Sequence, residues 1–227
     1  MALAQPIVLD KTAETFPLLT LANINRLAPR LYSIGEYLKL ERAATERHIY
    51  LDGRIFQMAG ESLAHSDICI NLGGELRTQL KGKPCRVLSP NMKVRSGPYQ
   101  EGQKSPKGFF SYADVSVVCG APQFHDKFRD VLLNPTVIIE VLSESTAIFD
   151  RREKLIRYRQ HLEALTDYLL VWQDRAIIEH FQLQPNNTWT HTPYIGLENS
   201  VFIASIECTL RLSEIYDRVE FPLQEEI

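Results

Sequence analysis

Apolar positions recur at helical spacing in the segment that follows Ser62. This spacing predicts an amphipathic helix of about five turns. The residues on its inner face are His65, Ile68, Cys69, Leu72, Leu76 and Leu80. Basic residues, a glycine and a proline at 81–84 end it. A shorter helix is predicted after Ser33, because Ser33 and Glu36 have the spacing of a capping box. A third helical pattern spans about 149–163.

Extended apolar runs predict a series of strands between and after these helices. Segment 48–58 places two apolar runs around the pair Asp52-Gly53, which is a strong hairpin signal. Run 137–142 is nearly all apolar and is therefore expected to be a central strand, buried on both faces. The other predicted extended segments are 85–95, 111–119, 168–172, 176–183, 188–194 and 200–210, with a short helix near 212–216.

The order of these elements predicts the fold class. A helix, strands, a second helix, a strand and then antiparallel additions are typical of an α/β sandwich, with a central mixed β-sheet flanked by helices. Residues 1–32 have mixed composition and are interpreted as an irregular N-terminal arm. Residues 33–227 are interpreted as a single domain, since no repeat, low-complexity tract or linker divides them.

Composition and charge limit how such a protein could bind nucleic acid. The chain has 227 residues, of which 44% are hydrophobic and 23% charged, as in ordinary globular proteins. A net charge of −3 and a pI of about 6.1 exclude binding by bulk charge alone. Basic residues nevertheless dominate segments 77–107 and 151–159. These stretches fit a phosphate-facing surface, and the alternative is a solvated loop and a solvated helix face.

Cysteine and histidine spacings give no sign of a zinc motif. The cysteines form no CxxC pair and lie among apolar neighbours, so buried free thiols are expected rather than disulfides. The histidines show no HxxxH or HxH spacing.

The first residues lack the pattern of a secretory signal, and no run approaches the roughly 18 apolar residues of a membrane span. A cytoplasmic location without membrane contact is therefore expected.

Two carboxylates interrupt the strongest predicted strands. Glu140 lies in run 137–142, where every other residue is apolar, and Asp114 interrupts the apolar segment 111–119. An unpaired buried carboxylate is very costly, so Glu140 must be paired, protonated or bound to a metal. A buried salt bridge for Glu140 and a strand-end turn for Asp114 are the simpler interpretations. Together on successive strands, the two residues form a candidate centre for a hard divalent cation.

The motifs around these carboxylates resemble the Uma family, a group of predicted restriction-endonuclease-like proteins in the PD-(D/E)xK nuclease superfamily. The matching stretches are Tyr50–Ile55, Tyr112–Val118, Val137–Thr146, Asp150–Lys154 with Tyr158, and Asp167–Val171. The resemblance covers roughly residues 33 to 220 and implies a restriction-endonuclease-like fold. It also implies that Asp114 and Glu140 hold Mg²⁺ or Mn²⁺ and that the substrate is DNA.

One position departs from the superfamily pattern. A lysine is expected two residues after the motif glutamate, on the same face of the strand, and Leu142 stands there. The resemblance implies that a migrated lysine, Lys154, takes the catalytic role from the following helix. The alternative is that Lys154 forms only an i,i+4 ion pair with Asp150 on a solvated helix face.

Four further residues are candidates to line the site. Asp150 and Tyr158 share a helix face with Lys154, and His65 matches a family histidine. Ile49 occupies a position where many family members carry glutamate. Glu46 is the nearby acid that could replace it.

The resemblance implies a metal-dependent endonuclease that hydrolyses DNA phosphodiester bonds. The alternative is a catalytically weak nuclease-fold module that binds nucleic acid or a protein partner, which Leu142 and Ile49 favour. A protein-interaction domain without a nucleic-acid role is the third hypothesis, favoured by the slightly acidic pI. A homodimer is compatible with cutting both strands of a duplex.

Overall fold

The largest sheet is mixed and has six strands. The computed structural model describes residues 16–24, 30–98, 106–143 and 147–222. The strand order is β11-β10-β9-β8-β6-β3, in which β8 and β9 are parallel and the other neighbours antiparallel. These strands are β3 (Cys85–Leu88), β6 (Val115–Cys119), β8 (Val137–Leu142), β9 (Asp167–Trp172), β10 (Ile177–Leu183) and β11 (Trp189–Ile195). The two parallel strands lie in its centre, as the apolar run 137–142 predicts.

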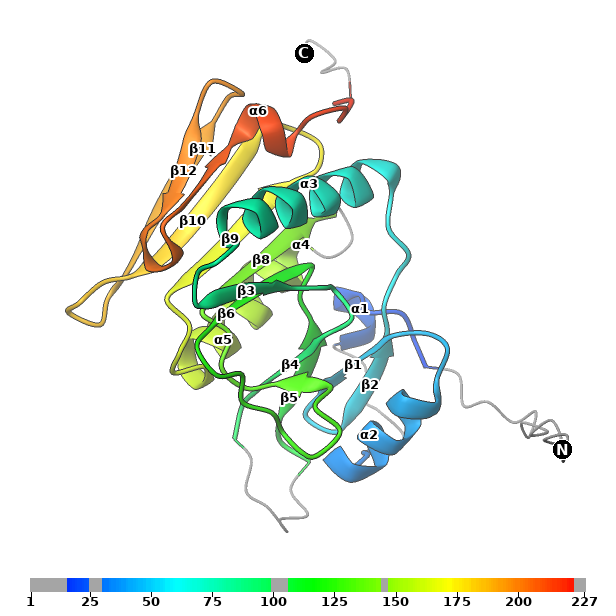
Figure 1. The fold of residues 1–227 in the computed structure, drawn as a ribbon. Helices are drawn as coiled ribbons and strands as arrows, with labels where there is room; N and C mark the ends of the chain where they lie inside the picture. The colour runs from blue at the N-terminus through cyan, green and yellow to red at the C-terminus, as the bar shows by residue number, and fades with distance from the viewer. Residues whose placement is uncertain (1–15, 25–29, 99–105, 144–146, 223–227) are drawn as a thin grey trace, which may run out of the picture.

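A second sheet of five strands packs beside the first (Figure 1). Its order is β2-β1-β5-β4-β7, with β4 and β7 parallel and the other pairs antiparallel. These strands are β1 (His48–Leu51), β2 (Arg54–Gln57), β4 (Lys93–Ser96), β5 (Phe109–Tyr112) and β7 (Val131–Leu132). Helix α2 (Ile34–Ala43) covers one face of this sheet. The capping box predicted for α2 is present, with Ser33 as the N-cap.

The predicted hairpin of β1 and β2 is confirmed. Asp52 and Gly53 both have positive φ, at 46° and 89°, as the tight turn of a two-residue hairpin requires. Gly53 also lies in a crowded place, since a Cβ there would come within 2.9 Å of the Cβ of Pro106. The turn therefore needs glycine for both conformation and space.

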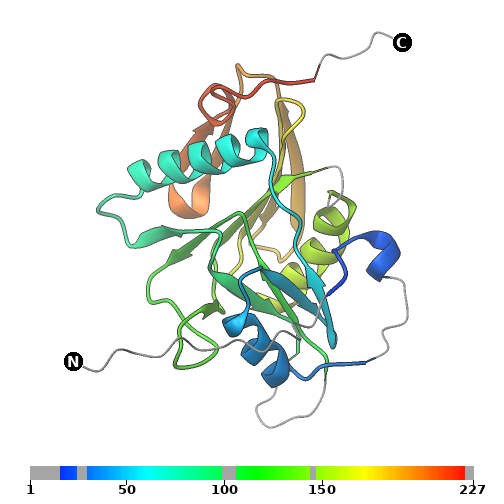
Figure 2. The ribbon, with the colours of Figure 1, turned by 90° about the vertical axis from the view of Figure 1, so that its right-hand side faces the viewer.

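Helices cover both faces of the six-stranded sheet (Figure 2). On one face lies α3 (Leu63–Gln79), which begins at the predicted cap Ser62 and is buried through Ile68, Leu72 and Leu76. On the other lies a helical segment made of α4 (Ala147–Phe149), the π-helical turn η1 (Asp150–Lys154) and α5 (Leu155–His161). The prediction of an α/β sandwich with a mixed sheet between helices is confirmed.

Strand β8 connects the two cores through its alternating side chains. Val137, Ile139 and Val141 belong to the core under α3. Ile138 and Leu142 belong to the core under α5, which also includes residues of the five-stranded sheet. Glu140 lies between Ile138 and Leu142 in the alternation along β8, so its side chain is directed to the same face as theirs, toward η1 and α5.

Three predicted strands are each divided in two, which corrects the sequence interpretation. Segment 111–119 breaks at Ala113-Asp114, because the chain passes there from β5 in one sheet to β6 in the other. Segment 85–95 divides between the same two sheets, into β3 and β4. Segment 200–210 folds back on itself as β12 (Ser200–Ile203), the 3₁₀ turn η2 (Ala204–Ile206) and β13 (Cys208–Arg211), followed by α6 (Leu212–Ile215).

The expectation that the cysteines are free thiols is wrong for two of them. Antiparallel pairing of β3 with β6 places Cys85 opposite Cys119, and their sulfurs form a disulfide. Their separation of 34 positions hides this contact from the sequence. Cys69 and Cys208 are free, as expected.

Part of the predicted N-terminal arm contacts the fold. Gln57 at the end of β2 donates its N–H to the carbonyl of Pro17 at 2.9 Å, and its own carbonyl accepts from Leu19 at 3.0 Å. The short helix α1 (Leu21–Ile24) follows. Residues 1–15 and 25–29 of the arm lie outside the described residues, and the single domain over 33–227 stays a prediction. Among the described residues, no helix combines the length and apolarity needed to cross a bilayer.

A charged network attaches α2 to the five-stranded sheet. Asp130, just before β7, accepts from Arg42 of α2 at 2.7 Å and lies 3.1 Å from the ammonium of Lys93 in β4. Arg42 chiefly, helped by Lys93, holds the pKa of Asp130 at about 2, below its ordinary 3.8. A carboxylate with a lowered pKa stabilises the fold above its unfolded pKa, and this contribution is lost as pH falls from about 4 to about 2.

We expect Asp130→Asn to lower the free energy of unfolding at pH 7 by about 1 kcal/mol, a value reduced for partial solvation of the pair. Its stability should also fall less steeply than that of the wild type between pH 4 and 2. Urea denaturation across this range measures both effects. The control is Asp217→Asn, whose carboxylate is 66% exposed. Parallel pH profiles for wild type and Asp130→Asn would contradict the role of this network.

Candidate active site

Asp114 lies where the chain leaves one sheet and enters the other. The antiparallel register pairs Val115 of β6 with Ile139 of β8, so Asp114 is placed beside the next residue of β8, Glu140. The Oδ2 atom of Asp114 accepts the backbone N–H of Val141 at 2.7 Å. The Asp114 side chain thus accepts the hydrogen bond of a β8 backbone N–H at the point where the pairing of β8 with β6 ends. This bond fixes the orientation of the Asp114 carboxylate.

Glu140 is buried in the middle of β8, with 2% of its surface exposed. Its Oε2 accepts from Nζ of Lys154 at 2.9 Å. Its Oε1 is buried and has no hydrogen-bond partner among the described residues. A buried carboxylate oxygen without a partner is unusual in a folded protein and indicates a place for a ligand that is not part of the chain.

Lys154 reaches this centre from the π-helical turn η1. Its ammonium lies 2.9 Å from Glu140 Oε2 and 2.9 Å from Asp150 Oδ1, and the residue is 4% exposed. The i,i+4 ion pair with Asp150 is therefore present, but on a buried face rather than a solvated one. The same ammonium also contacts Glu140, as the migrated-lysine prediction requires. Single π-helical turns are rare in proteins, and those that occur are often found at functional sites.

The charges in this group do not balance. Asp114, Glu140 and Asp150 lie around the single ammonium of Lys154. Burial chiefly raises the pKa of Glu140 well above its usual range; Lys154 opposes this effect, and the charges of Asp150 and Asp114 add to it. Burial alone would lower the pKa of Lys154, but Asp150 and Glu140 raise it, so the ammonium keeps its proton.

His65, in the first turn of α3, contacts Asp114 from the other side. Its Nε2 lies 3.2 Å from Asp114 Oδ1. Burial alone would lower the pKa of His65, but Asp114 raises it overall. Burial alone would raise the pKa of Asp114, but His65 lowers it overall. The two side chains therefore favour their charged forms together.

A cavity of about 180 Å³ brings most of the predicted site residues together. Five of them line it: His65, Asp114, Glu140, Asp150 and Lys154. Tyr158 does not line it and is instead fully buried near the rings of Phe109 and Tyr168. Glu46 is exposed in the turn before β1 and does not line it either.

Sequence reasoning missed Arg47 and Glu61, which also line the cavity. Arg47 follows directly after Glu46 and was not distinguished by any periodicity, because it precedes β1. Ile49 lies in the same wall, at the position where the family resemblance leads one to expect an acid. The cavity therefore has an apolar side chain at that position and a guanidinium two residues earlier, at Arg47.

The residues of the cavity fit a hard divalent cation. Asp114 and Glu140 supply carboxylate oxygens, which are the ligands that Mg²⁺ and Mn²⁺ prefer. The partnerless Oε1 of Glu140 and the raised pKa of this carboxyl both favour a cation, because a bound cation would stabilise the ionised carboxylate. His65 and Lys154 flank these carboxylates on opposite sides.

We expect Lys154→Met to lower the free energy of unfolding by about 3 kcal/mol in metal-free buffer, because two buried carboxylates lose their counter-ion. Urea denaturation with a chelator present measures this loss. The matched control is Arg152→Met in the same turn, which is exposed and should change stability by no more than about 0.5 kcal/mol. Equal, small losses in both variants would mean that the Lys154 ammonium is not held in the buried pair.

Comparison with known proteins places this chain in a family. Residues 34–213 match the model of the Uma2 family, described as "Putative restriction endonuclease". Two uncharacterised proteins of Synechocystis are similar: sll1609, 29% identical over 74% of this chain and 89% of its own length, and slr1290, 30% identical over 85% and 95%. A crystal structure of a putative nuclease belonging to DUF820 from Anabaena variabilis shares the fold, with a TM-score of 0.66 and 15% identity, over 83% of this chain and 99% of its own. Because the family model spans most of the sequence, the chain belongs to the Uma2 family of putative restriction endonucleases.

Proposed function

We propose that this protein is a metal-dependent endonuclease that hydrolyses phosphodiester bonds in DNA. The observation that carries the proposal is the group Asp114, Glu140 and Lys154 in one cavity, with Oε1 of Glu140 free of partners among the described residues. Two carboxylates and a lysine at one centre suit phosphodiester hydrolysis, and the family description points to the same chemistry.

Asp114 and Glu140 would hold Mg²⁺ or Mn²⁺. A bound ion would polarise the scissile phosphate and lower the pKa of the attacking water. Asp114 is oriented for this role by its bond to the Val141 N–H. Glu140 has one oxygen on Lys154, which leaves the other to face the ion.

Lys154 would stabilise the negative charge that develops on the phosphate or orient the water. Its position is fixed by two carboxylates, so little reorganisation is needed during the reaction. Arg47, on the same cavity wall, would bind a phosphate of the DNA backbone. The proposal also includes DNA as the substrate, a cytoplasmic location, and a homodimer with one centre for each DNA strand.

A nucleic-acid-binding module of low activity is the second candidate. It is favoured by the two ion pairs of Lys154, since an ammonium shared by Glu140 and Asp150 is less available to a phosphate. It also agrees with Leu142 at the place of the motif lysine. Such a module would bind DNA without Mg²⁺-dependent cleavage.

Cleavage of plasmid DNA tests the first candidate. We expect activity with Mg²⁺ or Mn²⁺ that is lost on chelation and falls by at least about 100-fold in Asp114→Ala, Glu140→Ala and Lys154→Met. The matched control is Glu46→Ala, which removes an exposed acid outside the cavity and should retain activity. Each variant is compared only after circular dichroism shows that it is folded.

Two results would contradict the proposal. Cleavage that persists in Asp114→Ala or Glu140→Ala would come from a contaminant or from another site. Absence of cleavage together with metal-independent DNA binding would favour the second candidate.

Arg47 gives a separate prediction about binding. We expect Arg47→Ala to weaken DNA binding about equally for different sequences and to reduce the slope of log K against log salt by about 1, because one phosphate contact is lost. Fluorescence anisotropy in a salt series, with Ca²⁺ in place of Mg²⁺, measures both. The control is Arg211→Ala, an exposed arginine of β13 that does not line the cavity. An unchanged salt slope in Arg47→Ala would exclude this contact.

A further inference from the structure

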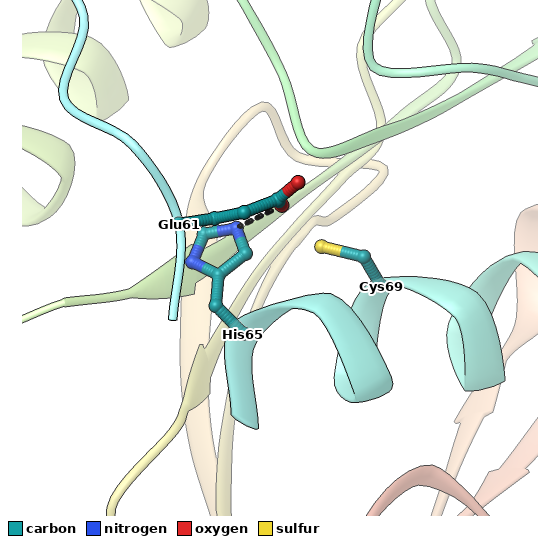
Figure 3. Close-up of side chains that lie close together, drawn as sticks. All are labelled: Glu61, His65 and Cys69. Carbon is teal, nitrogen blue, oxygen red and sulfur yellow. Dashed lines mark ion pairs between the residues drawn. The ribbon is translucent and has the colours of Figure 1, made fainter. Parts of the chain in front are cut away.

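A second group of metal-binding side chains lies next to the carboxylate centre, at the start of α3. Figure 3 shows that Glu61, His65 and Cys69 point toward one another from one side of the helix. The i, i+4 spacing of His65 and Cys69 keeps these two side chains on one face of α3, and Glu61 lies just before the cap Ser62. One carboxylate oxygen, one ring nitrogen and the thiol sulfur all lie within 4.8 Å of one another.

The distances in this group are near those of a tetrahedral metal site. Ligand atoms about 2.0–2.3 Å from a tetrahedral zinc ion lie about 3.3–3.8 Å apart. His65 Nε2 is 4.0 Å from Glu61 Oε2 and 3.2 Å from Asp114 Oδ1. The Glu61 side chain is 52% exposed and is free to close the remaining gap, whereas His65 is 14% exposed and held in place.

The start of the helix is rigid enough to present these ligands. Ser62 caps α3 by accepting the His65 N–H at 3.1 Å, and its hydroxyl donates to Gln173 after β9 at 2.8 Å. Cys69 packs against the core under α3. Two of the three ligands are therefore positioned by packing and capping before any ion binds.

The ligand types select the ion. Mg²⁺ takes oxygen ligands, whereas a thiolate and an imidazole suit Zn²⁺ and similar borderline ions. Cys69 and His65 supply these two ligand types, and Glu61 adds a carboxylate oxygen. Carboxylates on both sides of His65 favour a cation at this point.

We infer that Glu61, His65 and Cys69 form a zinc site whose open fourth position faces Asp114. Zinc on His65 replaces the proton that Nε2 shares with Asp114, so the zinc site and the carboxylate centre are neighbours that compete for one residue. The site does not depend on nuclease activity, because its three ligands belong to α3 and to the residue before its cap. The group has no pair of histidines or cysteines at motif spacing, because its three ligands are of three different types.

Cobalt titration of the full chain tests this inference without DNA. Co²⁺ replaces Zn²⁺ in such sites, and a thiolate ligand gives an ultraviolet charge-transfer band. We expect the band in the wild type, saturating at one equivalent and removed by one equivalent of Zn²⁺ but not by one equivalent of Mg²⁺. Cys69→Ala should lack the band, and the matched control Cys208→Ala, which removes the other free thiol, should retain it.

Glu61→Ala provides a variant that does not disturb the core, since this side chain is half exposed. We expect it to keep the band at saturation but to bind Co²⁺ at least about tenfold more weakly. Four results would each overturn the inference. The wild type could lack the band, folded Cys69→Ala could keep it, folded Cys208→Ala could lose it, or Glu61→Ala could bind Co²⁺ with unchanged affinity. Because no outcome involves cleavage, these results are independent of the nuclease proposal.

Discussion

The buried ion pair between Glu140 and Lys154 is the constraint on which the site depends. A carboxylate in the middle of a central strand is stable only if a counter-charge reaches it. No residue of β8 can supply that charge, because its other five side chains are apolar. The counter-ion must come from the helical segment on the same face of the sheet, and Lys154 in η1 meets this need. The π-helical turn is thus placed where the fold requires a cation, and its second partner Asp150 leaves the group with excess negative charge.

The same constraint explains how a lysine can leave its usual place in the motif. Two residues after Glu140, Leu142 is directed to the same side and packs in the core with Phe149 and Leu155. A lysine at that position would remove an apolar contact from this core. The Lys154 ammonium, which belongs to the helical segment facing β8, contacts the same carboxylate. The other side chains of β8 around Glu140 can therefore all be apolar. Lys154 on the facing helix therefore supplies the charge pair while the core retains its packing.

Local signals in the sequence predict the elements but not the way the two sheets meet. The cap at Ser62, the capping box at Ser33 and the turn at Asp52-Gly53 each depend on a few neighbouring residues, and each is present. The apolar pattern continues through Ala113-Asp114, so only tertiary structure shows that the chain changes sheets there. The Cys85–Cys119 disulfide and the position of Arg47 likewise depend on strand pairing. The family resemblance supplied Lys154, which periodicity alone left as an ordinary helical ion pair.

His65 is the residue through which two kinds of metal chemistry would meet. On one side it contacts Asp114, whose oxygens belong to a centre suited to a hard cation. On the other it lies in the group with Glu61 and Cys69, which suits a softer ion. A proton on Nε2 of His65 binds Asp114 and orients this carboxylate, whereas a metal on Nε2 would remove that donor and bring a larger positive charge close to Asp114. The identity of the ion at either site therefore depends on the state of this one imidazole, because the two groups are too close to be filled independently.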